Sequence, residues 1–220
     1  MSLDSDRAWD RAEARTHLAE ALAALALPTS PRTLDRLLDL CELLASWARR
    51  ISLTAHRTPG SILDRLVLDA AALANVLPGA ACVADLGSGA GFPGLPLAVL
   101  FPERRFTLVE ARERKHHFQR EAIRRLDLEN VQALLGRSEA LEPQRHEGVV
   151  AQAMARPHGV VPLLLPWADA GAWLAIPGGG NAPLVEAVPG VSGSEIRRYR
   201  IAATGVERTV WIGRKEATLL

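Results

Sequence analysis

The chain has 220 residues, of which 48% are hydrophobic, and a formal net charge of only +1. This length and hydrophobic share suffice for one buried core with an appended segment, and the near-neutral charge leaves any binding of an anionic partner to local patches. No apolar run reaches the roughly 18 residues that a membrane span needs, so no membrane-spanning helix is expected in these residues.

The cysteines and the N-terminal segment indicate the compartment. Cys41 and Cys82 lie in apolar stretches without metal-ligand spacing, which predicts buried free thiols, a reducing compartment and no metal site. Residues 18–27 are apolar like part of a signal peptide, but Glu20 interrupts them and acidic residues precede them. We therefore expect a cytoplasmic protein without a membrane partner. The oligomeric state is not indicated, and a monomer is assumed.

The first 78 residues predict a helical lead-in or cap. Residues 6–26 are rich in alanine and favour a helix that ends before Pro28. Over residues 32–50, apolar side chains recur at the i, i+3, i+4, i+7 spacing of an amphipathic helix with one buried face. A third helical stretch, 61–76, precedes the turn at Pro78 and Gly79.

From residue 79 onward, predicted strands and helices alternate. The strands fall at 83–86, 106–110, 131–135, 149–153 and 172–176, and the helices at 93–101, 112–125 and 160–167. This order predicts an α/β fold with a parallel, doubly wound sheet and helices on both faces. Residues 195–202 and 206–213 alternate apolar and polar around Thr204 and Gly205, which predicts an antiparallel hairpin at one sheet edge. We expect two parts, a lead-in over 1–78 and a Rossmann-like domain over 79–220.

Residues 83–94, V-A-D-L-G-S-G-A-G-F-P-G, have the pattern of a buried strand, a glycine turn and a helix start. Gly87, Gly89 and Gly91 let the backbone approach a ligand without interference from a Cβ atom. Asp85 is a carboxylate at the end of an apolar strand, and a polar partner is available at the mouth of the turn. The segment is therefore interpreted as a nucleotide-cofactor loop.

Two cofactor classes compete for this loop. Residues 89–94 match the dinucleotide pattern G-x-G-x-x-G, which is a weak signal alone. The longer string D-x-G-x-G-x-G, starting at Asp85, resembles the first motif of S-adenosylmethionine-dependent methyltransferases and is favoured. A parallel sheet that ends in an antiparallel hairpin is typical of class I methyltransferases and favours the same class. A structural glycine turn without a ligand is the third interpretation, which a buried carboxylate makes difficult to justify by packing.

Other polar residues follow neighbouring strands at the same predicted edge. Glu110 ends the second strand, where a carboxylate in such folds accepts hydrogen bonds from ribose hydroxyls, although a solvated strand-end acid is the alternative. Residues 136–139, G-R-S-E, follow the third strand, where a side chain can reach the adenine. Gln152 ends the fourth strand, at the substrate side of the predicted site.

Basic residues gather in three places. Either they converge beside the cofactor loop as a phosphate-binding surface, or they are solvated helix faces with local ion pairs. The first cluster is Arg49, Arg50, His56, Arg57 and Arg65; the second is Arg104, Arg105, Arg112, Arg114, Lys115, His116, His117, Arg120, Arg124 and Arg125; the third is Arg197, Arg198 and Arg200.

Several segments resemble the glucose-inhibited division protein B family, also called RsmG. Residues 47–54, W-A-R-R-I-S-L-T, are similar to its W-N-x-x-x-N-L-T segment, and D-L-G-S-G-A-G-F-P-G-L-P-L-A at 85–98 resembles its cofactor loop. F-T-L-V-E at 106–110, L-E-N-V at 128–131 and G-R-S-E at 136–139 follow at the family's spacing. The resemblance covers about residues 34–180. It implies N7-methylation of a guanine in 16S ribosomal RNA, the RNA partner, with S-adenosyl-L-methionine as the cofactor.

The resemblance also implies roles for single residues. By position, Gly87 and Phe92 contact the cofactor, Glu110 its ribose, and Ser138 with Glu139 its adenine side.

Three positions depart from the family's pattern. Where the family has a histidine ahead of an Asp-Ser pair, this chain has Leu66 ahead of Asp69 and Ala70. Where it has S-R-A after the fourth strand, this chain has A-Q-A at 151–153, and where it has L-K-G, this chain has I-P-G around Pro177. The cofactor motifs are intact and the substrate-side motifs are not.

The chemistry leaves several functions open. Guanine N7 has a free lone pair, so attack on a sulfonium methyl group requires no general base, and no Ser/His/Asp set is expected. Three interpretations remain: a ribosomal RNA methyltransferase, a methyltransferase with another substrate, and a cofactor-binding regulatory or interaction protein without turnover. An NAD-dependent oxidoreductase is a more distant fourth.

Overall fold

The computed structural model describes residues 9–152, 157–179 and 188–217, and the strands within them form one sheet. The strands are β1 (Cys82–Leu86), β2 (Arg105–Glu110), β3 (Val131–Leu135), β4 (His146–Val150), β5 (Ala168–Gly178), β6 (Val191–Arg200) and β7 (Glu207–Lys215). Their order is β3-β2-β1-β4-β5-β7-β6. The first five strands pair in parallel, whereas β7 is antiparallel to both β5 and β6. The predicted parallel sheet with a C-terminal antiparallel hairpin is confirmed.

The helices divide into a lead-in group and a group between the strands. The lead-in contains α1 (Arg11–Ala24), α2 (Pro31–Ala48), α3 (Pro59–Ile62), a π-helical turn (Leu63–Val67) and α4 (Leu68–Ala74). Between the strands lie α5 (Gly94–Leu100), α6 (Glu113–Arg125) and α7 (Pro157–Leu164). Helix α2 starts where predicted because the Ser30 hydroxyl accepts a hydrogen bond from the Thr33 amide and Pro31 occupies the first turn.

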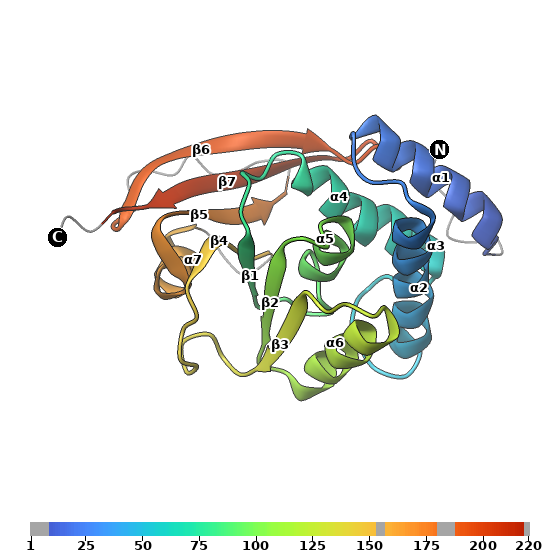
Figure 1. Cartoon of the computed structure of the whole chain (residues 1–220), viewed down its shortest axis with the longest axis horizontal. Coiled ribbons are helices and arrows are strands. Elements are labelled where there is room, and N and C mark those ends of the chain that lie inside the picture. The colour runs from blue at the N-terminus through green and yellow to red at the C-terminus, as the bar shows by residue number, and fades with distance from the viewer. Residues whose placement is uncertain (1–8, 153–156, 180–187, 218–220) are drawn as a thin grey trace.

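Helices cover both faces of the sheet (Figure 1). Helices α2, α5 and α6 lie on one face, and α7 lies on the other. Apolar residues of α1, α2, α5 and α6, such as Leu18, Leu37, Leu95 and Phe118, belong to one buried cluster. The lead-in thus packs against the helices that flank the cofactor loop. The division of the chain at residue 78 stays a prediction.

Several elements differ from the predicted bounds, and β6 and α7 begin at Val191 and Pro157 instead of residues 195 and 160. β4 begins at His146 instead of residue 149, and β5 begins at Ala168 instead of residue 172. Gly148 lies inside β4. The position requires glycine, because a Cβ atom there would stand 2.2 Å from the indole of Trp173 on the neighbouring strand. The predicted third helix, 61–76, is the combined α3, π-helical turn and α4. Ala153, predicted to end the fourth strand, lies outside the described residues.

The cysteines are free, but only one matches the prediction of buried thiols. Cys41 is fully buried on α2, whereas Cys82 is the first residue of the interior strand β1 and is half-buried. Among the described helices, none is long and apolar enough to cross a membrane.

Candidate functional site

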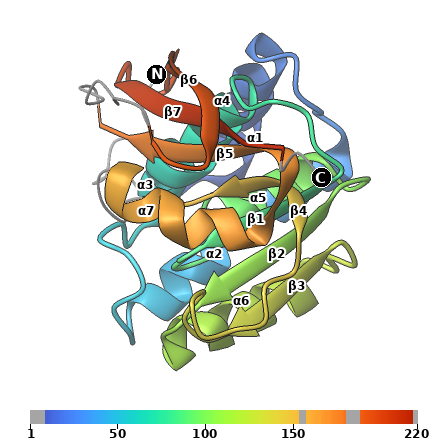
Figure 2. The same cartoon turned by 90° about the vertical axis from the view of Figure 1, so that its left-hand side faces the viewer.

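The predicted site residues gather at the carboxyl edge of the parallel strands. β1, β2, β3 and β4 end at Leu86, Glu110, Leu135 and Val150, and because the strands are parallel, the segments that follow them leave the sheet on the same side. Figure 2 shows the arrowhead of β2 on the side of the molecule where the light-blue segment after α2 also lies. In open α/β sheets, ligands bind outside this edge.

The glycine loop after β1 has the backbone that its sequence requires. Gly87, Gly89 and Gly91 have φ angles of 69°, 60° and 83°, in the left-handed region that favours glycine. The amides of Gly87 and Ser88 both donate to the Val109 carbonyl, at 2.9 and 3.1 Å, which fixes the loop to the end of β2. A side chain at Gly87 or Gly89 would therefore strain a turn that is already held on both sides.

Glu110 holds the loop from the neighbouring strand. Its side chain is 7% exposed, and its Oε2 accepts a hydrogen bond from the Gly89 amide at 2.9 Å. Its Oε1 accepts from the Arg112 amide at 2.8 Å, at the start of α6. These contacts place the carboxylate directly beside the glycine turn, where each oxygen still has a lone pair for a ligand hydroxyl. The alternative of a solvated strand-end acid is wrong for this residue.

Asp85 lies beneath the loop and is only 1% exposed. Its Oδ2 accepts a hydrogen bond from the Gly94 amide at 2.9 Å, so the polar partner that the sequence required lies within the chain. Its Oδ1 is buried without a hydrogen-bond partner among the described residues. Burial raises the pKa of this carboxyl to about 7, against the lowering effect of the Gly94 amide. Asp85 therefore ties the end of β1 to the start of α5.

Gln119 is a site residue that the sequence reasoning missed. It is fully buried on α6, and its Nε2 donates to the Ser88 Oγ and to the Gly89 carbonyl, both at 2.8 Å. The available signal was its position beside Phe118, on the apolar face of a helix whose charged residues are mostly exposed. Gln119 fixes the turn from the helix side, as Glu110 does from the strand side.

Lys115 and Phe92 lie at the same loop. The Lys115 Nζ stands 3.6 Å from the point that a Cβ atom on Gly89 would occupy. Phe92 is half-buried and packs against the cluster shared by the lead-in and α6. An ammonium group beside the glycine turn gives the open side of the loop a positive charge.

Ser138 and Glu139 follow β3 at the same edge. The Ser138 hydroxyl donates to the Glu139 carboxylate at 3.2 Å, and its carbonyl accepts from the Trp167 indole at 3.2 Å. Gly136 begins this turn, and its amide donates to the Glu110 carbonyl at 3.0 Å. The segment is thus placed next to Glu110, although within the described chain its two polar side chains make no hydrogen bond to the glycine loop.

The substrate-side positions contrast with the loop. Gln152 is half-buried after β4, and its side chain makes no hydrogen bond or ion pair to another residue in the described part of the chain. Pro177 is buried in β5 opposite Val210. Leu66 packs against the core cluster where the family pattern has a histidine.

Asp69, the acid that this chain keeps after Leu66, faces the hairpin. Its Oδ2 lies 3.5 Å from the Arg208 guanidinium on β7, and burial raises its pKa. Asp69 is therefore buried and paired with a residue of the hairpin.

The comparisons with known proteins agree on one family. A family model described as GidB, rRNA small subunit methyltransferase G, matches residues 33–187. The chain is 36% identical over 195 residues to the ribosomal RNA small subunit methyltransferase G of Chromohalobacter salexigens, covering 88% of this chain and 93% of that protein. It is 41% identical over 127 residues to the protein of the same name from Dichelobacter nodosus, covering 58% of this chain and 60% of that protein.

A likeness to a solved structure supports the fold. An S-adenosylmethionine-dependent methyltransferase from Aquifex aeolicus superposes with a TM-score of 0.51 at 17% identity, covering 70% of this chain and 93% of that one.

Proposed function

The chain belongs to the GidB family of ribosomal RNA small subunit methyltransferase G proteins, and we propose that it transfers a methyl group from S-adenosylmethionine to N7 of a guanine in 16S ribosomal RNA. One observation carries the proposal. A left-handed glycine turn is held by the Glu110 carboxylate on one side and by Gln119 on the other, at the carboxyl edge of a methyltransferase sheet.

The residues at this edge fit the cofactor. S-adenosylmethionine supplies an activated methyl group on a sulfonium centre. The Glu110 carboxylate, fixed by two amides, is positioned to accept hydrogen bonds from ribose hydroxyls, and Gly87 and Gly89 leave space for close approach of the ligand. Ser138 and Glu139, next to Glu110 in space, would contact the adenine side. Phe92 would contact the cofactor from the loop. Asp85 and Gly91 would keep the loop in the conformation that binds the cofactor.

The transfer itself requires positioning more than proton chemistry. Guanine N7 carries a free lone pair, so no side chain has to remove a proton before attack. What this chain must supply is an orientation of the base and a site from which water is excluded. A neutral amide at Gln152 can still donate one hydrogen bond to the guanine O6, which compensates in part for the arginine that the family pattern has there.

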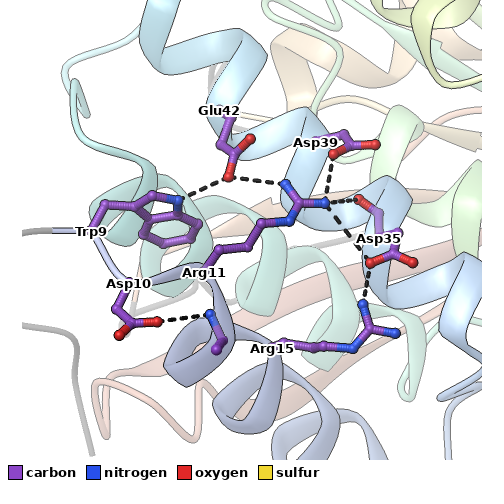
Figure 3. A network of polar contacts seen from close by, with 8 residues as sticks. Trp9, Asp10, Arg11, Arg15, Asp35, Asp39 and Glu42 are labelled. Carbon is purple, nitrogen blue, oxygen red and sulfur yellow. Dashed lines mark hydrogen bonds and ion pairs between the residues drawn. The ribbon is translucent and has the colours of Figure 1, made fainter.

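The arginines of the lead-in support an RNA surface on one side of the molecule. On α1, Arg11 contacts Asp39 at 2.6 Å and Glu42 at 2.9 Å, and Arg15 contacts Asp35 (Figure 3). The arginines between the end of α2 and the π-helical turn have no acidic partner among the described residues. Arg49 and Arg50 directly follow α2, Arg57 lies in the segment after them, and Arg65 lies in the π-helical turn.

The other two clusters also contain arginines that form ion pairs with acidic residues. Arg124 and Arg125 pair with Glu121 at the far end of α6, and Arg197 and Arg200 pair with Glu195 and Glu207 on the hairpin. At the start of α6, near the glycine loop, the cations lack such a partner in the described chain. They are Arg112, Arg114 and Lys115. We propose that RNA phosphates bind these free cations beside the cofactor loop, and that the hairpin contributes little.

The substitutions at Gln152 and Pro177 favour one second candidate, a methyltransferase that acts on another substrate. Both candidates bind the same cofactor, so the RNA product decides between them.

The test uses the purified protein with S-adenosylmethionine and unmethylated small-subunit ribosomal RNA. We expect one N7-methylguanine, located by mass spectrometry of nuclease fragments. Calorimetric titration should show binding of S-adenosylmethionine and no binding of NAD. Cofactor binding with no methylated guanine would favour the second candidate, and binding of NAD instead would overturn the cofactor assignment.

A further inference from the structure

A cavity lies at the end of α2, outside the residues assigned to the cofactor. Its volume is about 320 Å³, and it is lined by Ser46, Trp47, Arg49, Arg50 and Ile51. This volume is at the lower end of the range for small-ligand pockets. Trp47 and Ile51 are half-buried, so both offer apolar surface to the cavity, whereas the two arginines are exposed.

The lining has the composition of a nucleotide site. An indole ring with an adjacent aliphatic side chain provides the flat apolar surface on which unpaired bases stack. The two guanidinium groups have no acidic partner in the described chain, and arginine binds phosphate in a bidentate manner. A small apolar ligand would leave both charges unused, and a duplex would not present an unstacked base. The chemistry therefore matches one nucleotide of a single-stranded RNA segment.

A chain of contacts joins the cavity to the cofactor loop. The Trp47 ring packs edge-on against Phe118, with ring centroids 5.6 Å apart and an interplanar angle of 71°. The next residue, Gln119, donates to the Gly89 carbonyl of the glycine turn. The segment that follows Arg50 lies on the same side of the molecule as the carboxyl end of β2 (Figure 2). An RNA strand that presents a guanine at the glycine loop can thus pass over the end of α2.

We propose that this cavity is a subsite for a nucleotide that flanks the target guanine, with the base stacked on Trp47 and its phosphates held by Arg49 and Arg50. The inference rests on the proposed RNA methyltransferase function and deepens it. In this role Trp47 is a positioning residue, because it holds the RNA and touches no reacting atom. The pocket would accept any base, since each base has a flat face to stack and the lining residues do not form a set of paired donors and acceptors.

The first experiment measures binding without turnover. The probes are a short single-stranded oligoadenylate and an abasic backbone of the same length. Wild type should bind the oligoadenylate about tenfold more tightly, a typical effect for one base stacked on an aromatic ring. Trp47→Leu should bind both probes equally, and Trp47→Phe, which keeps a ring and the contact with Phe118, should keep part of the preference. The inference is overturned if wild type shows no preference or if Trp47→Leu retains it.

A second comparison tests the phosphate contacts. Arg49→Gln combined with Arg50→Gln should weaken both probes equally and reduce the salt dependence of binding. Arg32→Gln is the matched control, because Arg32 lies at the opposite end of α2, is exposed and is paired with Asp127 at 2.9 Å. It should leave both affinities unchanged. Equal losses in the control and in the double variant would contradict a specific phosphate site.

Steady-state kinetics then separate this inference from the proposed function. Trp47→Leu should raise the KM for small-subunit RNA about tenfold with a much smaller change in kcat. If the wild-type protein makes no N7-methylguanine but prefers the oligoadenylate through Trp47, the proposed function fails and the subsite stands. If it methylates normally and Trp47→Leu changes neither KM nor probe preference, the subsite fails and the function stands.

Discussion

The two halves of the carboxyl edge are built differently. Around the glycine loop, hydrogen bonds from neighbouring elements fix the turn: Val109 and Glu110 bind it from β2, Gln119 binds it from α6, and Asp85 binds the start of α5. On the proposed substrate side, Gln152 has no side-chain partner among the described residues, and Arg49, Arg50, Arg112 and Arg114 have no acidic partner there either. The difference indicates that the cofactor half is preorganised by the fold, whereas the substrate half depends on its ligand for order.

The largest effect is expected from adding an atom to the tightly packed region beneath the glycine loop, in the cofactor half. In Gly94→Ala, the new Cβ atom would lie 2.2 Å from the Leu108 Cδ2 and 2.9 Å from the Asp85 Oδ2. We expect a loss of about 3 kcal/mol of unfolding free energy by urea denaturation, together with a clear loss of S-adenosylmethionine affinity. Gly79→Ala is the control, since nothing stands within 4 Å of its Cβ position. An unchanged denaturation midpoint in Gly94→Ala would refute the tight packing of the loop.

A pH effect should follow from Asp85, whose pKa is raised to about 7 by burial. A carboxyl group with a raised pKa binds protons more tightly in the folded state, so its contribution to stability is complete below the unfolded pKa and is lost as the pH rises through about 7. Unfolding free energy should therefore fall by roughly 2 kcal/mol between about pH 5 and pH 8. Asp85→Asn should remove this contribution. Asp69, whose pKa burial also raises, acts in the same direction, whereas His56 and His146, whose pKa values burial lowers, act in the opposite direction in both proteins. A slope that is identical in both proteins would exclude Asp85 as its source.

Removing the hydrogen bonds that Gln119 on α6 donates to the glycine loop should have a smaller effect. Gln119→Leu keeps a similar volume but leaves the Ser88 hydroxyl and the Gly89 carbonyl without their donor. We expect a loss of about 1 to 2 kcal/mol of stability and several-fold weaker binding of S-adenosylmethionine by calorimetry. Arg120→Gln, on the exposed face of the same helix, should change neither quantity. Equal effects of the two substitutions would show that the contacts of Gln119 do not support the loop.

The fixed half could be predicted from sequence because its information is local. Glycines at alternate positions after a buried acid predict a turn with left-handed backbone, and a glutamate that ends the next parallel strand is expected at the same edge; the structure has both features at Gly89 and Glu110. The contact between these two residues was not predicted. Gln119 was missed because its role depends on how α6 packs, which no short motif records. The bounds of β4 were wrong because Gly148 looks like a strand breaker until its contact with Trp173 is known.

The smallest effect is expected at Gln152, on the half that depends on its ligand. If the natural substrate is a guanine in small-subunit RNA, Gln152→Arg adds a charge-assisted hydrogen bond in place of a neutral one, a difference of about 1 kcal/mol. N7-methylation of that RNA should then stay level or rise up to several-fold, whereas Gln152→Ala should lower it, and neither variant should shift the denaturation midpoint, because the side chain makes no hydrogen bond within the described chain. A loss of activity in Gln152→Arg, measured as methyl transfer at limiting RNA, would mean that this side of the site has adapted to another substrate while the cofactor half stayed as it was.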